Sequence, residues 1–235
     1  ITGGASGVGE ALVRAFSAQG AEVYFLDFDQ PLGEKLASEL GAGVHFRPVD
    51  VTDPAALKAE VDRAADTLAD LSIILNNVGN DARHSFEDMT PEYVKTTFSV
   101  NLDPVIYTSQ AAIPRLQARG GGTIVNIGSL NWILGPADLP AYAAAKGAIT
   151  ALTKSIARQY GPEYIRANTI VPGWVVTEKQ RRLWLTPEAE ADWKSLCCLK
   201  DDLLPADVAN LALFLASSAS RMITGQAYVI DAGRT

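Results

Sequence analysis

The sequence predicts a single α/β domain of the Rossmann type, with a doubly wound parallel sheet and helices on both of its faces. Short apolar runs alternate with amphipathic, helix-like stretches along all 235 residues, which is typical of parallel sheets. A hydrophobic fraction of 48% supplies a large core, while 20% charged residues argue against disorder and membrane spans. We therefore expect one soluble, cytoplasmic domain spanning residues 1–235.

Six short apolar runs bounded by turn residues or by helix-like stretches are expected as strands. They lie at Glu22–Asp27, Val44–Val49, Leu71–Asn76, Thr123–Ile127, Ile165–Val171 and Ala227–Ile230. Because helix-like stretches separate most of them, neighbouring strands should run parallel.

Helix starts are predicted where a capping side chain precedes a proline, as at Asp53-Pro54, Thr90-Pro91 and Thr186-Pro187. The Asp or Thr oxygen accepts an amide of the first turn, and the proline has no amide to leave unpaired. Gly161-Pro162 should end the helix that carries Tyr142.

One segment, at about residues 174–204, interrupts this alternation. It is longer than an ordinary connection and rich in Trp and charged residues, so we expect it to form a lid over the site.

Composition excludes several partners. A formal charge of −7 without a Lys/Arg-rich run gives no electrostatic footprint for nucleic acid or a membrane surface. The only cysteines, Cys197 and Cys198, are adjacent, and adjacent residues seldom form an unstrained disulfide, so a reducing compartment fits. His45 and His84 are far apart and offer no metal-ligand spacing, so no metal is expected.

The first candidate site is the glycine-rich turn Thr2-Gly-Gly-Ala-Ser-Gly-Val-Gly9, followed by a helix-like stretch. Glycines let a backbone approach a pyrophosphate, and the helix amino end adds amides and a favourable dipole. Asp27 ends the next strand, where a carboxylate accepts hydrogen bonds from a ribose diol and repels the extra phosphate of NADP. NAD is the expected cofactor; the alternative is a plain surface turn with Asp27 as a helix cap.

The second candidate site centres on Tyr142 and Lys146, which lie four residues apart in an alanine-rich run that predicts a helix. A free tyrosine loses its proton near pH ~10, and a neighbouring cation lowers that value toward the range of a general base. Ser129 would hold the substrate oxygen. The alternatives are a solvated Lys146 and a plain strand-end hydroxyl at Ser129.

These motifs together resemble the short-chain dehydrogenase/reductase family over nearly the whole chain. The residues that carry the resemblance are Thr2-Gly3-xxx-Gly7-x-Gly9, Asp50-Val51, Asn76-Asn77-Val78-Gly79, Asn101, Ser129, Tyr142-xxx-Lys146 and Pro172-Gly173-xxx-Thr177. Val78 departs from the pattern, since many relatives carry alanine there. The resemblance implies an oxidoreductase with the catalytic set Asn101, Ser129, Tyr142 and Lys146.

The resemblance also implies roles around the cofactor: Asp50 and Val51 would contact adenine, Asn76 and Gly79 would line the adenosine ribose and stabilise the sheet, and Thr177 would reach the nicotinamide carboxamide. Asn101 would hold a water bonded to Lys146. The alternatives are that Asp50 caps a turn, that Asn101 bends its helix or bonds locally, and that Thr177 caps the next segment. The residues expected to bind NAD are Gly3, Ser6, Gly7, Val8, Gly9, Asp27, Phe28, Asp50, Val51, Asn77, Val78, Gly79, Tyr142, Lys146, Pro172, Gly173, Val175 and Thr177.

Family members have about seven strands, the first of which precedes the glycine-rich turn. Ile1 stands at what would be the last residue of that strand, so we expect that residues precede it. The resemblance further implies a homotetramer or homodimer, paired through helices at residues 90–119 and 141–160.

The variable segments favour a sugar or polyol over a steroid or fatty acyl chain, because flat aromatic faces and many polar groups gather there. The tryptophans are Trp132, Trp174, Trp184 and Trp193. A closer resemblance joins the chain to the branch that contains bacterial NAD-dependent D-xylose 1-dehydrogenases; it is carried by Gly79-Asn-Asp-Ala-Arg-His84, Gly128-Ser-Leu-Asn-Trp132, Thr186-Pro-Glu188, Cys198-Leu-Lys200 and Ile230-Asp-Ala-Gly233.

That resemblance implies oxidation of an aldose at its anomeric carbon. Candidate substrate contacts are Asn80, Asp81, His84, Ser129, Asn131, Trp174 and Gln180. The alternatives are another sugar such as L-fucose or L-arabinose, a 3-oxoacyl thioester, and a keto-deoxy sugar acid recognised by Arg83, Arg181 or Arg182. A binding protein that senses NAD without turnover is the alternative from another class.

Overall fold

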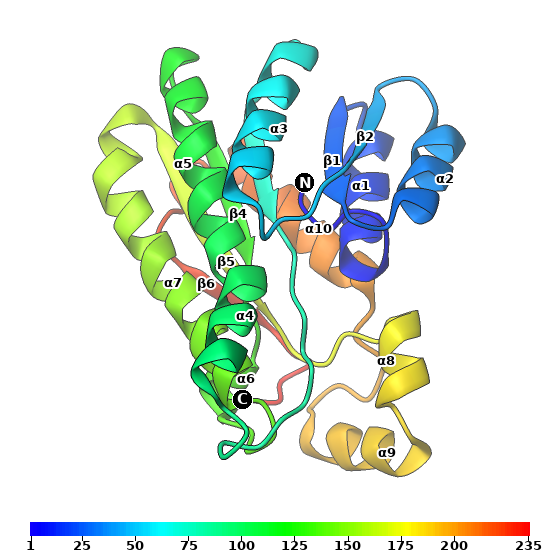
Figure 1. The fold of residues 1–235 in the computed structure, drawn as a ribbon. Coiled ribbons are helices and arrows are strands. Elements are labelled where there is room, and N and C mark those ends of the chain that lie inside the picture. The colour runs from blue at the N-terminus through cyan, green and yellow to red at the C-terminus, as the bar shows by residue number, and fades with distance from the viewer.

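The computed structural model describes residues 1–235 and contains a twisted parallel sheet between two layers of helices (Figure 1). The strands are β1 (Val23–Asp27), β2 (Val44–Pro48), β3 (Ile73–Asn76), β4 (Gly122–Ile127), β5 (Ile165–Pro172) and β6 (Ala227–Ile230). Every pairing is parallel, in the orders β1-β2 and β3-β4-β5-β6. The six predicted strands are confirmed, with ends that differ by at most two residues.

The segment Ile1–Gly4 runs between β1 and β3 and joins the two sets of strands. The Thr2 amide donates to the Leu75 carbonyl (3.0 Å), and the Leu26 amide donates to the Ile1 carbonyl (2.9 Å). Ile1 and Thr2 thus occupy the position that the family resemblance gives to the end of the first strand.

The predicted helix starts are confirmed, because Asp53, Thr90 and Thr186 each accept an amide of the turn that follows. The helices are α1 (Gly7–Ala18), α2 (Gln30–Leu40), α3 (Pro54–Thr67), α4 (Pro91–Asn101), α5 (Asp103–Ala118), α6 (Asn131–Leu134), α7 (Pro140–Tyr160), α8 (Glu178–Leu183), α9 (Pro187–Leu196) and α10 (Pro205–Ala216), with 3₁₀ turns η1 (Gly161–Glu163) and η2 (Ser218–Ser220). As predicted, α7 ends just before Gly161.

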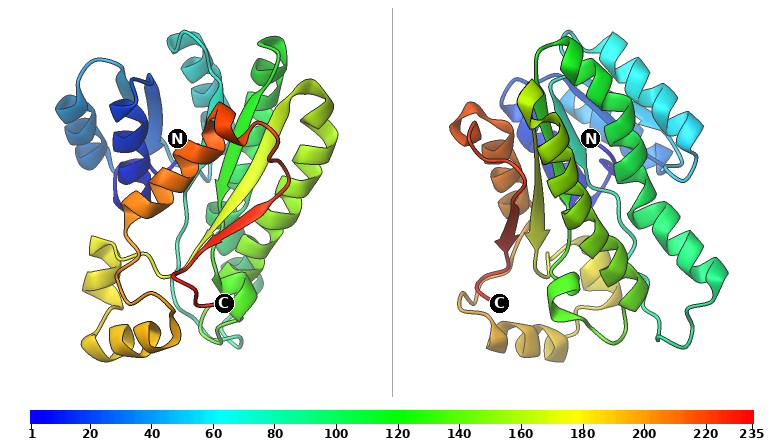
Figure 2. Two further views of the ribbon diagram at one scale, coloured as in Figure 1. Left: turned by 180° about the vertical axis from the view of Figure 1, so that it is seen from behind. Right: turned by 90° about the vertical axis from the view of Figure 1, so that its left-hand side faces the viewer.

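The core lies on both faces of the sheet. Helices α1 and α10 cover one face and α3, α5 and α7 the other, as the edge-on view in Figure 2 illustrates. Neighbouring residues of β4 show the alternation: Ile124 packs with the α3, α5 and α7 layer, and Val125 with the α1 and α10 layer. Strands buried on both faces explain why their sequences read as continuous apolar runs.

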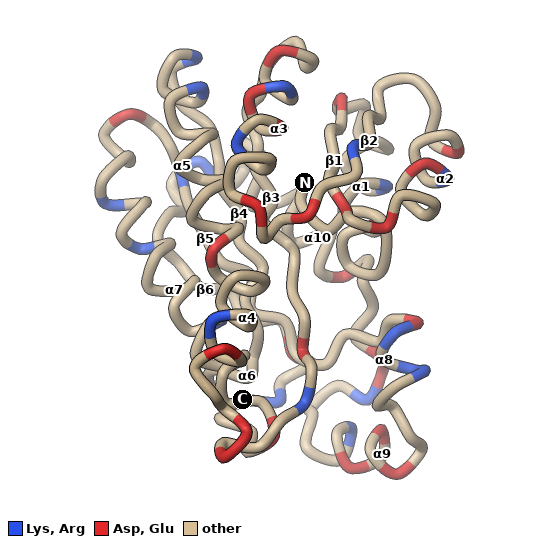
Figure 3. Tube along the Cα trace, in the orientation of Figure 1, with Lys and Arg blue, Asp and Glu red and all other residues tan.

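Charged residues of both signs are interspersed over the helices, without a basic stripe (Figure 3). No helix combines the length and the apolar character needed to cross a bilayer.

Helices α8 and α9 form an excursion between β5 and α10, beyond the carboxyl ends of the strands (Figure 1). A parallel bridge between Val175 and Leu203 closes its base, with the Val176 amide donating to the Leu203 carbonyl (2.9 Å). This is the segment for which the sequence predicts a lid.

A buried polar ladder attaches α7 to the middle of the sheet. Asn76 donates to Asn126 across β3 and β4 (2.8 Å), and Asn126 donates in turn to the Thr153 hydroxyl on α7 (2.8 Å). Thr169 on β5 also donates to Thr153, which itself donates to the Ile149 carbonyl (both 2.8 Å). The Thr153 hydroxyl therefore uses its donor and both acceptor positions, and α7 is fixed to the sheet by polar as well as apolar contacts.

Replacing Thr153 by valine should lower the free energy of unfolding by about 1–3 kcal/mol, because two buried donors lose their acceptor. The measurement is urea denaturation at a fixed protein concentration. Thr67→Val is the matched control, since the Thr67 hydroxyl also donates four residues back but is exposed and accepts no buried donor. Equal losses in the two variants would contradict the ladder's contribution.

Candidate active site

The glycine-rich turn leads into the amino end of α1, and its conformation and packing require glycine at several positions. Gly3 and Gly7 have positive φ values of 66° and 56°, and a Cβ at Gly9 would lie 1.7 Å from the Gly3 carbonyl oxygen. Ser6 is the N-cap of α1, yet its hydroxyl accepts no helix amide. The turn therefore fits a pyrophosphate held by backbone amides, with the partly buried Val8 beside it.

Asp27 ends β1 beside this turn, with 7% of its surface exposed. Its two oxygens accept the amides of Ala5 (2.9 Å) and Asp29 (3.0 Å), which fixes the carboxylate. Each oxygen keeps a second lone pair that could accept a ribose hydroxyl. The Phe28 ring next to it is 82% exposed and free to contact an adenine.

Asp50, after β2, is exposed and accepts the amide and hydroxyl of Thr52 (2.9 and 2.8 Å). The bond from the Thr52 amide has the larger effect and the bond from its hydroxyl the smaller one, and both lower the pKa of Asp50. Asp50 therefore caps a turn, which is the alternative role that the sequence allowed for it. Contact of Asp50 and the buried Val51 with adenine stays a prediction.

The Asn76–Gly79 segment serves the fold as well as the cofactor surface. Asn76 stabilises the sheet as expected, but its buried amide bonds Asn126 within the sheet, so it does not line a ribose. The Asn77 amide side chain donates to the Gly3 carbonyl (2.9 Å) and so holds the glycine-rich turn in place.

Lys146 lies on α7 with only 2% of its surface exposed. Its ammonium donates to the carbonyls of Ile127 (3.1 Å) and Val78 (3.3 Å), at the carboxyl ends of β4 and β3. A Cβ at Gly79 would lie 3.2 Å from the Lys146 nitrogen, so glycine keeps this space open. Burial lowers the pKa of Lys146 to about 8, although the charge of Asp81 acts in the opposite direction.

Tyr142 and Lys146 share one face of α7, with the Lys146 nitrogen 5.7 Å from the centroid of the Tyr142 ring. The expected lowering of the tyrosine pKa is nevertheless absent. Burial first, and the charge of Asp81 second, raise the pKa of Tyr142 above its usual range, and only the Ser129 hydroxyl opposes them. Desolvation disfavours the charged phenolate, which favours the neutral phenol in the free protein.

Ser129 follows β4 and is 8% exposed. Its hydroxyl lowers the pKa of Tyr142 and accepts the amide of Asn131 (3.2 Å), the half-buried first residue of α6. The structure therefore brings Ser129, Tyr142 and Lys146 together at the carboxyl edge of the sheet.

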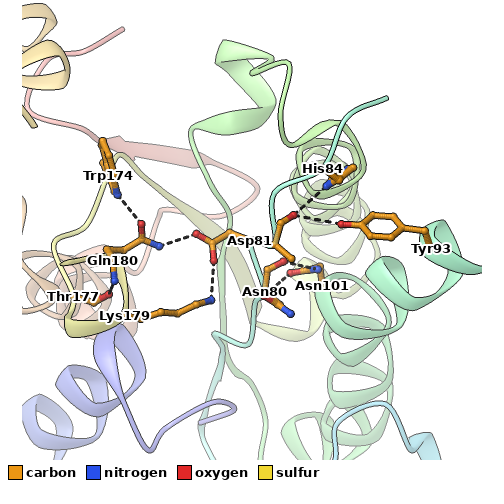
Figure 4. Close-up of polar contacts among 10 residues, drawn as sticks. Asn80, Asp81, His84, Tyr93, Asn101, Trp174, Thr177, Lys179 and Gln180 are labelled. Atoms are coloured by element: carbon orange, nitrogen blue, oxygen red, sulfur yellow. Dashed lines mark hydrogen bonds and ion pairs between the residues drawn. The ribbon is translucent and has the colours of Figure 1, made fainter. Parts of the chain in front are cut away.

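Asn101 is the last residue of α4, and its side-chain amide is occupied locally (Figure 4). It accepts the Asn80 amide (2.8 Å) and donates to the carbonyls of Thr97 (2.9 Å) and Asn80 (3.2 Å). These bonds match the local role weighed for Asn101 in the sequence, while its part in a water relay stays a prediction.

Asp81 is the centre of a polar cluster that joins the segment after β3 to α8 (Figure 4). Its oxygens accept Lys179 (2.8 Å) and Gln180 (2.7 Å), and Gln180 in turn accepts the indole N–H of Trp174 (2.8 Å). Burial works to raise the pKa of Asp81, but the bonds from Lys179 and Gln180 outweigh it and the pKa lies below its usual value. Sequence reasoning missed Lys179, because a lone lysine on a short helix carries no signal.

Thr177 connects α8 to the glycine-rich turn. Its hydroxyl accepts the Gln180 amide (3.2 Å) as the N-cap of α8, and its methyl group would lie 3.4 Å from a Cβ at Gly7. Pro172 is the last residue of β5, and Gly173 and Val175 follow it, with the Gly173 amide donating to the Ile230 carbonyl (2.8 Å). The expected carboxamide contact of Thr177 is compatible with this position.

His84 is placed differently from the expectation that it contacts the substrate. It is 8% exposed, its Nε2 accepts the Ala141 amide (3.1 Å), and its Nδ1 lies 3.0 Å from the Ala82 carbonyl (Figure 4). Both ring nitrogens are engaged by the backbone, so neither is free for a sugar hydroxyl.

Two of the arginines considered for carboxylate recognition are also occupied. Arg83 forms an ion pair with Asp138 and its guanidinium carbon lies 4.9 Å from the centroid of Trp184. Arg181 pairs with Asp202 (3.0 Å).

Comparison with known proteins agrees with this arrangement. A family model described as enoyl-(acyl carrier protein) reductase matches residues 3–235. The chain is 43% identical to a probable galactose dehydrogenase of Rhizobium meliloti (strain 1021) and 42% identical to D-xylose 1-dehydrogenase of Caulobacter vibrioides. Each match covers 99% of this chain and 93% of the relative.

Solved structures give the same result. The fold matches a 3-ketoacyl-(acyl-carrier-protein) reductase from Brucella melitensis complexed with NADH, with a TM-score of 0.91 at 27% identity over 99% of this chain and 96% of that one. It also matches an oxidoreductase of the short-chain dehydrogenase/reductase family from Burkholderia thailandensis, with a TM-score of 0.90 at 34% identity over 99% and 90%. Motifs, fold and relatives together show that the chain is an oxidoreductase of the short-chain dehydrogenase/reductase family.

Proposed function

We propose that the protein oxidises a hydroxyl group of a cyclic sugar with NAD, most simply the anomeric C1 hydroxyl of an aldopentose such as D-xylose, to give the lactone. The observation that carries this proposal is the polar cluster of Asp81, Gln180 and Trp174 next to the catalytic tyrosine. The identity to the galactose and xylose dehydrogenases supports the same substrate class.

The cluster suits a molecule with several hydroxyl groups. Asp81 only accepts hydrogen bonds, and each of its oxygens keeps a lone pair beyond its bond to Lys179 or Gln180. The bond from Trp174 fixes which way the Gln180 amide points. The side chain of Asn80 is exposed, and the Asn80 backbone is fixed by its hydrogen bond to Asn101. Asn131 lies beside Ser129 and donates its backbone amide to the Ser129 hydroxyl. Fixed polar groups of this kind discriminate a sugar from an apolar substrate.

In the proposed mechanism, Ser129 and Tyr142 both hydrogen-bond the substrate hydroxyl, and the Tyr142 oxygen takes its proton. Bound NAD supplies the hydride acceptor and brings a positively charged ring to the site. Because burial keeps the phenol neutral in the free protein, its ionisation depends on nearby cations, and Lys146 is the cation that this chain provides. In the reverse direction Tyr142 returns the proton.

The preference for NAD follows from Asp27. Its carboxylate is fixed by two backbone amides, and the next residues, Phe28, Asp29 and Gln30, carry no positive charge to pair with a phosphate. A 2′-phosphate would therefore meet a negative charge without compensation.

Two alternatives lose support from the geometry. For a sugar acid, two of the three candidate arginines, Arg83 and Arg181, are held in ion pairs, which leaves only the exposed Arg182. An NAD sensor without turnover would not need Ser129, Tyr142 and Lys146 together, yet all three meet at one edge of the sheet.

The first experiment follows reduced-cofactor absorbance with aldopentoses, aldohexoses, deoxysugars, polyols, secondary alcohols, and keto-acid and oxoacyl substrates, each with NAD or NADP. We expect the highest kcat/KM for one aldose with NAD. Turnover of keto-acid or oxoacyl substrates alone would contradict the sugar assignment and keep the catalytic set. Cofactor binding without turnover of anything would favour the sensor.

Replacing Tyr142 by phenylalanine should lower kcat by about 10²–10⁴-fold, the usual contribution of a positioned acid or base, while NAD binding persists. The measurement combines steady-state kinetics with cofactor titration. Tyr160→Phe is the matched control, since it removes the same atom at the far end of α7. Near-normal turnover of Tyr142→Phe would refute Tyr142 as the base.

The charge around Asp81 should set the pH at which oxidation begins. Asp81 raises the pKa of Tyr142, so Asp81→Asn should move the acid limb of the kcat/KM profile to lower pH. Lys179→Met should move it to higher pH, because the Asp81 charge then loses its paired cation. Shifts of the same sign in both variants, or none, would show that Asp81 does not act on the base.

A further inference from the structure

The helix that carries Tyr142 begins without a cap of its own. Leu139 occupies the N-cap position of α7 and has no side-chain oxygen, so no side chain there accepts an amide. Pro140 comes first in the helix and has no amide, which leaves the amide of the fully buried Ala141 as a donor that needs a partner.

That partner comes from 57 residues earlier in the chain. The Ala141 amide donates to Nε2 of His84 at 3.1 Å. Since Nε2 accepts, the imidazole is neutral and its proton lies on Nδ1, which donates to the Ala82 carbonyl at 3.0 Å. The His84 ring is therefore a helix cap supplied by tertiary structure.

The segment that holds this ring is itself fixed on several sides. The His84 amide donates to the Asp138 carbonyl (2.9 Å), and its ring packs on Tyr93 of α4 with 4.6 Å between centroids. Upstream, Asn80 is held by Asn101, the last residue of α4. His84 thus links the segment expected to contact the substrate to the first turn of α7.

We propose that His84 is a positioning residue that places Tyr142 by capping α7. Tyr142 directly follows Ala141, so the bond that holds the Ala141 amide also fixes where the phenol leaves the helix. The proposal rests on the proposed role of Tyr142 as the base. Capping α7 in this way requires residue 84 to accept a hydrogen bond from the Ala141 amide and to donate one to the Ala82 carbonyl. The imidazole combines both functions.

The direct test compares His84→Leu with His84→Gln. Leucine keeps bulk and removes both nitrogens, whereas glutamine retains a carbonyl acceptor and an N–H donor. We expect kcat to fall by about 10²-fold in His84→Leu, the effect of misplacing a reacting group by about 1 Å, with an unchanged KM for the cofactor. His84→Gln should recover most of that loss.

His45→Leu is the control, since it removes the chain's other imidazole, which stacks on Tyr24 away from the site. We expect it to leave kcat unchanged. Unaltered kcat in His84→Leu, or equal losses in the leucine and glutamine variants, would overturn the proposal.

Hydrogen–deuterium exchange separates this proposal from the proposed function, because it needs no substrate. Amides at the start of α7, those of residues 141–147 in its first two turns, should exchange faster in His84→Leu than in the wild-type chain and at near-wild-type rates in His84→Gln. Unchanged exchange in His84→Leu would refute the cap. Faster exchange together with normal kcat would keep the cap and refute its action on Tyr142.

Discussion

The buried ammonium of Lys146 is the constraint around which the site is arranged. A charge with 2% exposure needs compensating dipoles, and the carbonyls of Val78 and Ile127 supply them where β3 and β4 end. Those carbonyls converge because the strands are parallel and end at one edge of the sheet. Gly79 completes the arrangement by leaving out the Cβ that would crowd the nitrogen.

The same burial governs the chemistry of Tyr142. In a poorly solvated site the phenolate is disfavoured, and the negative charge of Asp81 disfavours it further. Asp81 also belongs to the polar cluster with Gln180 and Trp174, and Lys179 partly neutralises it. The proposed substrate recognition and the proposed base are thus coupled through one carboxylate, whose partners Lys179 and Gln180 lie on α8.

The segment from Asn80 to His84 ties these features together although it has no regular secondary structure. Asn101 holds its beginning, residues of α8 hold its middle, and Ala141 holds its end. A connection anchored by α4, α7 and α8 can present polar side chains in fixed directions. The sequence shows that this segment is polar, but it does not show which polar groups bond the backbone and which are left for a substrate. Both ring nitrogens of His84 bond the backbone, whereas Asp81 is compatible with a substrate contact.

The sequence by itself determined the parallel sheet, the helix caps at Asp53, Thr90 and Thr186, the glycine-rich turn, and the shared face of Tyr142 and Lys146. These depend on local periodicity, capping and spacing, which neighbouring residues carry. Only the tertiary structure decided that Lys179 pairs with Asp81, that His84 caps α7, and that burial raises the pKa of Tyr142. Partners distant in the sequence and burial of a charge arise from packing, and no local pattern records either of them.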